Sequence, residues 1–256
     1  MRIVIKVGTS TLAHATGKLN IRAFEELIKV IADLKNSGHE IILVSSGAIG
    51  MGTGKLALPA RPTDTPTKQA AAAVGQCELM YMYDKYFGEY HHTVAQMLLT
   101  ADDFEDEEKY KNLSNTLARL LELNALPVIN ENDSVSTAEL GIGDNDTLSA
   151  LVAIGARADL LVLLSDIDGL YTADPHKDKS AALIGEVRET DERIFALGGE
   201  SGSSLGTGGM KTKLSAAKLV TDEGIDMIIT NGAKPYLLYD IAEGRPAGTR
   251  FIGKKQ

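Results

Sequence analysis

Carboxylates and amides are concentrated in the stretch from Val128 to Ala150, "VINENDSVSTAELGIGDNDTLSA", which lies between a strand-like and a helix-like apolar run. Side chains of these types could hold an ammonium group, orient lysines or bind a metal ion. Helix capping accounts for one of the two acids Asp144 and Asp146, but it does not account for the "NEND" segment before them. The spacing and closing glutamate of a calcium-binding loop are absent, so we assign no metal ligands and predict a polar binding site.

Two glycine-rich segments have the pattern of anion-binding helix starts. In "GTGGMKTK", from Gly206 to Lys213, glycines would let backbone N–H groups approach a polyphosphate, and Lys211 and Lys213 add positive charge. The segment "VSSGAIGMG", from Val44 to Gly52, has the same plan and predicts donors for a second anion. A flexible surface loop and a tight turn are the respective alternatives. The chain has no complete P-loop pattern, so nucleotide binding would follow another scheme.

Lys6 is a charged residue inside the apolar run "IVIKVG" near the start of the chain. The following "GTS" turn would place it at the carboxyl end of a strand, the edge of an α/β sheet at which ligands bind. A lysine that reaches from the end of a strand to water is the alternative.

Short apolar runs alternate with segments of helical periodicity along the whole chain. The strand-like runs are apolar on both faces, which is typical of parallel strands covered by helices on both sides. The sequence therefore predicts a three-layer α/β/α sandwich with a mainly parallel central sheet, in one domain of residues 1–256. The predicted strands are Arg2–Val7, Ile41–Ser46, Thr93–Leu99, Leu126–Asn130, Asp159–Asp166 and Asp226–Gly232. One predicted helix begins after Asn20, which we expect to be its N-cap, and ends at Gly38. The other predicted helices cover Thr67–Phe87, Lys109–Asn124, Asn145–Ala156, Gly209–Glu223 and Pro235–Glu243.

Composition limits the partners and the compartment that are compatible with the chain. The net charge of 26 − 35 = −9 and the lack of a long basic run argue against nucleic acid and anionic membranes as partners. The single cysteine, Cys77, excludes an internal disulfide and fits a reducing compartment, and we interpret it as a helix core residue. We find neither a signal peptide nor a run of about 18 apolar residues for a membrane span, so we expect a cytoplasmic protein.

Taken in chain order, seven segments resemble the amino acid kinase family over nearly the whole chain, from Lys6 to Gly248. They are "KVGTSTL", "VSSGAI", "QMLLT", "VINENDSV", "GDND-LSA", "LLSDIDGLYTADP" and "GTGGMKTKLSAA". The resemblance implies the amino acid kinase fold and ATP-dependent phosphorylation of the side-chain carboxylate of L-glutamate to L-glutamyl 5-phosphate, for proline synthesis. It also implies magnesium as a cofactor and proline as a feedback inhibitor. We expect the protein to be a homo-oligomer. Many relatives carry a C-terminal PUA domain, and because the sequence ends with "GTRFIGKKQ" we expect the form without it.

The resemblance also implies roles for individual residues. Lys6 and Lys213 would act on the phosphoryl group from opposite sides, and Asp146 would hold both lysines in place. The acceptor half would comprise residues 1–155, and the nucleotide half residues 156–256. The residues implied in glutamate binding are Ser46, Gly47, Asp133 and Asn145, with Asp133 facing the ammonium group. Those implied in ATP binding are Lys6, Gly8, Ser165, Asp166, Gly206, Thr207, Gly208, Gly209, Met210, Lys211, Thr212 and Lys213.

Two other functions remain open from the sequence. A sibling kinase would act on aspartate, acetylglutamate, carbamate or a nucleoside monophosphate, although the last acceptor would need more basic residues than "NEND" provides. A regulator that binds nucleotide or amino acid without catalysis is the second alternative, and the retained Lys6, Asp146 and Lys213 argue against it.

Overall fold

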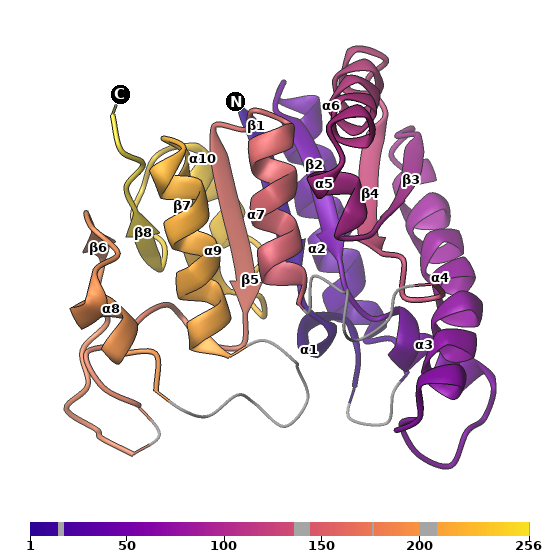
Figure 1. Ribbon diagram of the computed structural model, residues 1–256, viewed down its shortest axis with the longest axis horizontal. Coiled ribbons are helices and arrows are strands. Elements are labelled where there is room, and N and C mark those ends of the chain that lie inside the picture. The colour runs from indigo at the N-terminus through magenta and orange to yellow at the C-terminus, as the bar shows by residue number, and fades with distance from the viewer. Residues whose placement is uncertain (15–17, 136–143, 176, 200–208, 256) are drawn as a thin grey trace.

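The computed structural model describes residues 1–14, 18–135, 144–175, 177–199 and 209–255. Within these residues, eight strands form one sheet in the order β3-β4-β2-β1-β5-β7-β8-β6 (Figure 1). Every strand pair is parallel except β7–β8, which is antiparallel. The strands are β1 (Arg2–Val7), β2 (Glu40–Ser45), β3 (Val94–Leu99), β4 (Leu126–Glu131), β5 (Leu160–Ser165), β6 (Glu186–Val187), β7 (Asp226–Asn231) and β8 (Thr249–Phe251).

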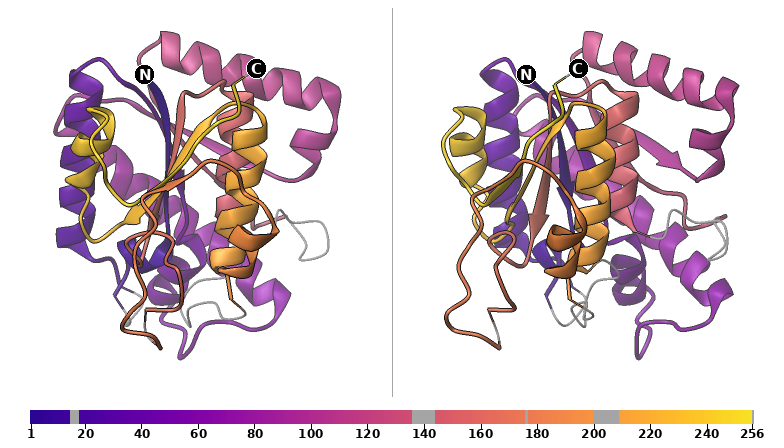
Figure 2. Two further views of the ribbon diagram at one scale, coloured as in Figure 1. Left: turned by 90° about the vertical axis from the view of Figure 1, so that its left-hand side faces the viewer. Right: turned by 60° about the vertical axis from the view of Figure 1, so that its left-hand side comes forward.

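Helices cover both faces of the sheet, as two views from the side show (Figure 2). In β1, Val4 packs into a hydrophobic cluster on one face of the sheet, whereas Ile3 and Ile5 pack into a second cluster on the other face. This burial on both faces explains why the strand sequences are continuously apolar. The helices are α1 (Thr9–Leu12), α2 (Ile21–Asn36), α3 (Ala48–Lys55), α4 (Thr65–Gly88), α5 (Asp102–Glu105), α6 (Glu107–Glu122), α7 (Asn145–Gly155), α8 (Glu192–Ala196), α9 (Met210–Asp222) and α10 (Leu237–Ala242).

The predicted three-layer α/β/α class is confirmed, and so are all six predicted strands and all six predicted helices, with ends that differ by two residues or fewer. The short elements α1, α5, α8, β6 and β8 were not predicted. Strand β8 has three residues, too few to show a periodicity of two. It follows Gly248, whose positive φ of 83° favours glycine at the turn into the antiparallel pair.

Strand β1 lies where the two halves of the chain meet. It pairs on one side with β2 from the first half and on the other side with β5 from the second half. In open α/β sheets, such a reversal of strand order opens a crevice at the carboxyl ends of the strands. Those ends form the lower edge of the sheet in Figure 1, and Lys6 is the penultimate residue of β1.

Helices α3 and α4 cross in close contact beside this edge because two glycines remove side chains from the crossing. A Cβ atom at Gly52 would overlap the backbone of Ala71, and one at Gly75 would overlap the carbonyl group of Ala48. The crossing fixes the part of α4 that follows Gly75. Cys77 lies here and is exposed, so its interpretation as a helix core residue is wrong. The buried face of α4 carries Ala72, Gln76 and Leu79 instead.

No helix in the described part of the chain combines the length and the apolar character needed to cross a bilayer.

Candidate active site

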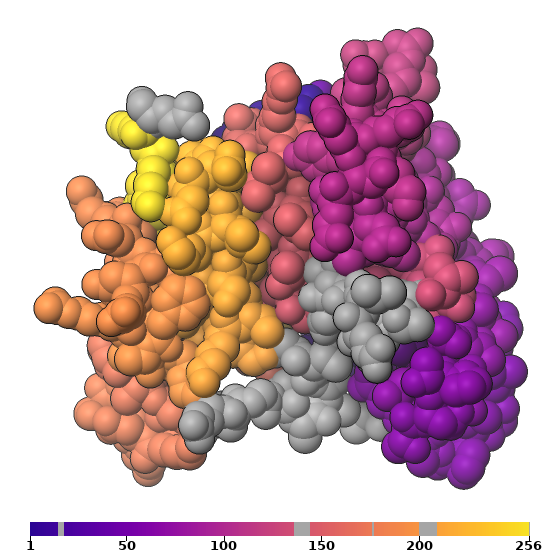
Figure 3. Space-filling model, viewed as in Figure 1, coloured from indigo at the N-terminus to yellow at the C-terminus, as the bar shows by residue number. Residues whose placement is uncertain are grey.

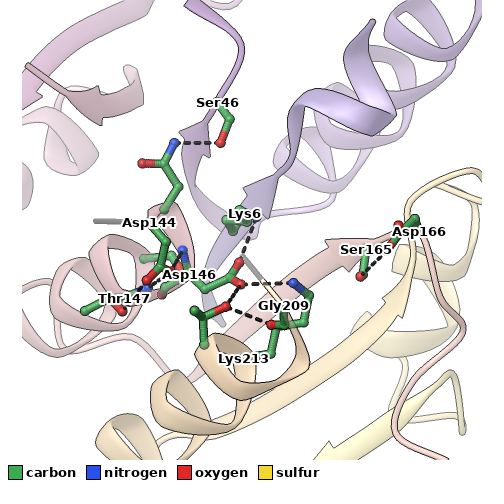
Figure 4. Close-up of polar contacts among 12 residues, drawn as sticks. Lys6, Ser46, Asp144, Asp146, Thr147, Ser165, Asp166, Gly209 and Lys213 are labelled. Atoms are coloured by element: carbon green, nitrogen blue, oxygen red, sulfur yellow. Dashed lines mark hydrogen bonds and ion pairs between the residues drawn. The ribbon is translucent and has the colours of Figure 1, made fainter. Parts of the chain in front are cut away.

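The carboxylate of Asp146 lies between two lysines that come from opposite ends of the sequence (Figure 4). Lys6 Nζ on β1 is 2.7 Å from Asp146 Oδ1, and Lys213 Nζ on α9 is 3.0 Å from Asp146 Oδ2. All three side chains are buried, with relative exposures of 8% for Lys6, 7% for Lys213 and 1% for Asp146. The structure therefore brings the three predicted catalytic residues together in one buried cluster.

Capping at the start of α7 holds Asp146 in place. Asp144 is the N-cap residue, and its Oδ1 accepts hydrogen bonds from the backbone N–H groups of Asp146, at 2.8 Å, and Thr147, at 2.9 Å. Ser149 Oγ donates to the carbonyl oxygen of Asp146 at 2.7 Å. Asp144 thus performs the capping expected of one acid, which leaves Asp146 to pair with the lysines.

The first turn of α9 contributes Lys213 and a second contact to Asp146. Thr212 Oγ1 lies 3.0 Å from Asp146 Oδ2 and 2.8 Å from the carbonyl oxygen of Gly209, the N-cap residue of α9. Lys213 is unusual at a helix N-terminus because its charge opposes the helix dipole. Asp146 offsets this unfavourable placement. Met210 is half-buried, and Lys211 is exposed on the same turn.

The cluster carries a net positive charge directed at the edge of the sheet. Burial favours the neutral form of Asp146, but the charges and hydrogen bonds of Lys6 and Lys213 outweigh burial and hold the pKa of Asp146 below its usual value. Two ammonium groups and one carboxylate sum to 2 − 1 = +1. An anion that enters this site can be stabilised by the excess charge.

A series of hydrogen-bonded polar side chains connects the start of α7, next to Asp146, with α4. Asn145 Nδ2 donates to Ser46 Oγ at 2.7 Å and to Asn130 Oδ1 at 3.0 Å. Asn130 Nδ2 in turn donates to Gln76 Oε1 at 2.9 Å. Asn130 and Gln76 are buried, with exposures of 2% and 7%. The amide of Asn145 therefore joins the strand ends of β2 and β4, next to Asp146.

A pocket of about 400 Å³ opens beside these hydrogen-bonded side chains, between helices α3 and α4 and the ends of β3 and β4. Asp133 lines the pocket, and its pKa is raised to about 6, first by burial and second by the charge of Glu131, while Arg61 acts in the opposite direction. A carboxyl group that is desolvated and close to a second carboxylate favours a cationic ligand. The lining residues are Ala48, Ala72, Ala73, Gln76, Cys77, Met80, Gln96, Leu98, Glu131, Asn132, Asp133 and Ser134.

Other predicted residues lie along the same edge of the sheet. Gly8 caps α1 directly after β1, and Gly47 caps α3 directly after β2 with a left-handed φ of 111° that favours glycine. Ser165 ends β5, and its hydroxyl donates to Asp166 Oδ1 at 3.2 Å, away from the Asp146 cluster (Figure 4). Gly206, Thr207 and Gly208 lie outside the described residues.

Sequence interpretation missed Gln76 and assigned no individual role to Asn130. Gln76 follows Ala72 by four residues and precedes Leu79 by three, so helical periodicity places it on the same buried face as these two residues. A glutamine on an otherwise apolar helix face is the signal that was available, because a buried amide requires hydrogen-bond partners.

The chain is similar to known proteins in both sequence and fold. Residues 1–231 match the profile of the amino acid kinase family. The carbamate kinase from Giardia lamblia bound to AMP-PNP superposes with a TM-score of 0.70 at 18% identity, over 98% of each chain, which shows a common fold. The chain belongs to the amino acid kinase family.

Within the family, the chain is similar to glutamate 5-kinases. It is 51% identical to the "Glutamate 5-kinase" of Clostridium perfringens, over 99% of this chain and 96% of the relative. It is also 51% identical to the enzyme of the same name from Caldanaerobacter subterraneus subsp. tengcongensis, over 100% of this chain and 68% of the relative.

Proposed function

We propose that the protein catalyses the ATP-dependent phosphorylation of the side-chain carboxylate of L-glutamate to L-glutamyl 5-phosphate, the first step of proline synthesis. The relatives of about half-identical sequence support this substrate and reaction. The observation that carries the mechanism is the convergence of Lys6 and Lys213 on Asp146 at the carboxyl edge of the sheet.

The chemistry of this transfer needs positive charge more than it needs a base. A glutamate side chain has a pKa near 4.3 and is already ionised at neutral pH, so no residue has to remove a proton from it. The carboxylate must instead approach the charged γ-phosphoryl group. Two unit charges about 3.5 Å apart repel by roughly 5 kcal/mol at an effective dielectric constant of 20. Lys6 and Lys213 would offset this repulsion from either side of the transferring group.

The first half of the chain, residues 1–155, would bind the acceptor. Ser46 and Asn145, which are hydrogen-bonded to each other, and the backbone at Gly47 would lie along the side chain of glutamate. Asp133 would pair with its ammonium group in the pocket beside α4. This arrangement directs the far carboxylate of the substrate toward the lysines.

The second half, residues 156–256, would bind ATP. The start of α9, which follows Gly206, Gly208 and Gly209 in the sequence, would offer backbone N–H groups to the phosphates. Gly8, Ser165 and Asp166, which lie at or directly after the ends of β1 and β5, would also contact ATP. Within the described residues, no group of three or more potential metal ligands occurs. Magnesium commonly keeps several waters and is held through substrate phosphates, so we propose that it enters as part of the MgATP substrate.

Replacement of Asp133 by asparagine is expected to raise the KM for glutamate at least about tenfold, because a charge-assisted contact to the ammonium group contributes roughly 1.5–3 kcal/mol. The KM for ATP should change less than about twofold. Steady-state kinetics with each substrate varied in turn measures both values, and Asp84→Asn, at an exposed position of α4, serves as the matched control. Equal effects on the two KM values would indicate a structural role for Asp133.

The pH dependence should report the same carboxyl group. Asp133 has a pKa of about 6 in the free protein, and its protonated form cannot pair with an ammonium group. We therefore expect kcat/KM for glutamate to fall as the pH is lowered through about 6, and this step should be absent from the Asp133→Asn profile. An unchanged acid limb in the variant would assign the titration to another group.

The stability of the free protein gives a second readout for Asp133. Its raised folded pKa means that the folded protein binds more protons than the unfolded chain between pH 3.8 and 6, so ionisation of Asp133 lowers stability as the pH rises through this window. The Asp133→Asn protein should accordingly be at least as stable as the wild type at pH 7.

ADP release measured with a panel of acceptors tests the proposed reaction. We expect glutamate to support turnover, and aspartate, acetylglutamate, carbamate and UMP to give little. Turnover with another acceptor alone would identify a sibling kinase, and binding of nucleotide without ADP release under any condition would identify a regulator.

The family resemblance and the composition of the chain lead to three further proposals. Proline would act as a feedback inhibitor, the protein would assemble as a homo-oligomer, and it would act in the cytoplasm. Inhibition kinetics, light scattering and cell fractionation test these proposals in turn.

A further inference from the structure

We propose that Gln76 is the residue that recognises the α-carboxylate of the amino-acid substrate, through the free N–H groups of its side-chain amide. The proposal rests on the function given above and adds a specificity-determining residue to it. It is carried by a buried donor that lacks a partner, at the wall of the pocket that contains Asp133.

The direction of the hydrogen bonds around Asn130 fixes the orientation of its amide. The backbone N–H of Glu131 donates to Asn130 Oδ1 at 2.9 Å, and a backbone N–H can only donate. The oxygen of the Asn130 amide must therefore lie on this side, where it also accepts from Asn145 Nδ2. Its nitrogen, Nδ2, is left to point at Gln76.

The orientation of Gln76 follows from that of Asn130. Because Asn130 Nδ2 is a donor, the atom of Gln76 that it meets at 2.9 Å must be the oxygen, Oε1. Gln76 Nε2 then faces the other way with two N–H groups. It is buried, and it has no hydrogen-bond partner among the described residues. Rotating the Gln76 amide by 180° would place its NH₂ group against the NH₂ group of Asn130. The hydrogen bonds around Asn130 therefore exclude the flipped orientation, and Nε2 stays without a partner.

The position of Gln76 indicates which kind of group its Nε2 amide would bind. Gln76 lines the pocket that Asp133 and Glu131 also line, and it is 7% exposed. A buried donor without a partner destabilises the folded protein, so the group is expected to find its acceptor in a ligand. Two carboxylates in the same pocket exclude an isolated anion but suit a ligand that carries an ammonium group and an acceptor side by side.

An α-amino acid has this combination of groups on a single carbon atom. Its ammonium group would pair with Asp133 while an oxygen of its α-carboxylate accepts from Gln76 Nε2. The site would then select an amino acid with a free α-carboxylate over an amine that has the same reactive carboxylate but lacks this group. 4-Aminobutanoate is such an amine, because it equals glutamate without the α-carboxylate.

Comparison of L-glutamate with 4-aminobutanoate in the full-length protein tests the proposal. We expect Gln76→Met to lower kcat/KM for glutamate roughly 10- to 100-fold, the range of one hydrogen bond to a charged group, and to change the value for 4-aminobutanoate less than about twofold. Gln76→Glu keeps the acceptor for Asn130 and sets a carboxylate against the substrate, so it should raise the KM for glutamate further. Gln69→Met, on the same helix and outside the pocket lining, is the matched control.

Two measurements separate the outcomes. Thermal unfolding verifies that each variant is folded, and Gln76→Glu replaces Gln76→Met where the latter is not. Equal losses with both substrates would overturn the proposal, since they would show that Gln76 only holds Asn130 and supports the packing of α4. Calorimetry measures glutamate binding without turnover. It therefore distinguishes failure of the proposed role of Gln76 from failure of the proposed kinase function. A wild-type protein that binds glutamate through Gln76 but releases no ADP would contradict the kinase reaction alone, and one that binds no glutamate would overturn both.

Discussion

Lys213→Ala is expected to lower kcat by about 10³-fold or more and to leave the protein folded. A single positive side chain that stabilises the transition state of phosphoryl transfer is worth about 10³–10⁵ in kcat. The fold should tolerate the change because Asp146 keeps its second partner, Lys6, at 2.7 Å, so no buried charge is left alone. Steady-state kinetics and thermal unfolding of the purified variant measure the two effects.

Lys218→Ala supplies the matched control for this experiment. Lys218 lies on the same helix, α9, but its side chain is about half exposed and pairs with Asp222 at the surface. Its removal should change kcat less than twofold, because exposed ion pairs contribute little. A Lys213→Ala protein with near-normal kcat would remove Lys213 from the mechanism.

Asp146→Asn is expected to abolish turnover and also to destabilise the protein, by about 3–5 kcal/mol. The variant leaves two buried ammonium groups close together without a counter-charge, whereas Lys213→Ala leaves a balanced pair. Urea unfolding followed by circular dichroism measures the difference in the free energy of unfolding.

Further replacement of Lys213 by methionine in the Asp146→Asn protein separates stability from activity. We expect the double variant to recover part of the lost stability, because it removes one of the two opposing charges, and to remain inactive. The wild-type protein should also lose stability as the pH falls below about 3.8, since the folded pKa of Asp146 lies under that value and protonation removes the ion pairs. Equal stability of wild type and Asp146→Asn at pH 7 would contradict the structural role of Asp146.

The long elements of the fold were predictable because their sequences are locally consistent. The run Arg2–Val7 is apolar on both faces, and the structure buries both faces, Val4 against one layer of helices and Ile5 against the other. Asn20 was predicted to cap the following helix, and its side chain accepts from the backbone N–H of Ala23. Where propensity, periodicity and capping all indicate the same element, the local sequence is enough to predict it.

The short elements and the burial of individual helix residues were not predictable in the same way. β6 and β8 exist because β8 pairs with both β7 and β6, a contact between distant parts of the chain that no local pattern encodes. Cys77 is apolar enough for a core, but the α3–α4 crossing turns it toward the pocket. Tertiary packing, rather than local preference, decides such positions.

The candidate site was predictable in part. The position of Lys6 at a strand end and of Lys213 at a helix start followed from the sequence, and the family resemblance added their shared partner, Asp146. Physical reasoning alone could not bring Lys6 and Lys213 together, because 207 residues separate them in the sequence and tertiary contacts, among them the packing of α9 against α7 and of α7 against β1, close that distance. In Figure 3, the orange surface of α9 lies toward the left and the purple surface of α3 and α4 lies toward the right. The hydrogen bond between Asn130 and Gln76 could not be predicted, because it joins two residues that are 54 positions apart in the sequence.

A crystal structure of the protein with glutamate, MgADP and aluminium fluoride as a mimic of the transferring phosphoryl group tests the central claim most directly. We predict that Lys6 Nζ and Lys213 Nζ both lie within about 2.7–3.2 Å of the mimic, on opposite sides of it, with Asp146 still in contact with both lysines. A mimic bound elsewhere, with either ammonium group more than about 5 Å away, would contradict the role of the two lysines in phosphoryl transfer.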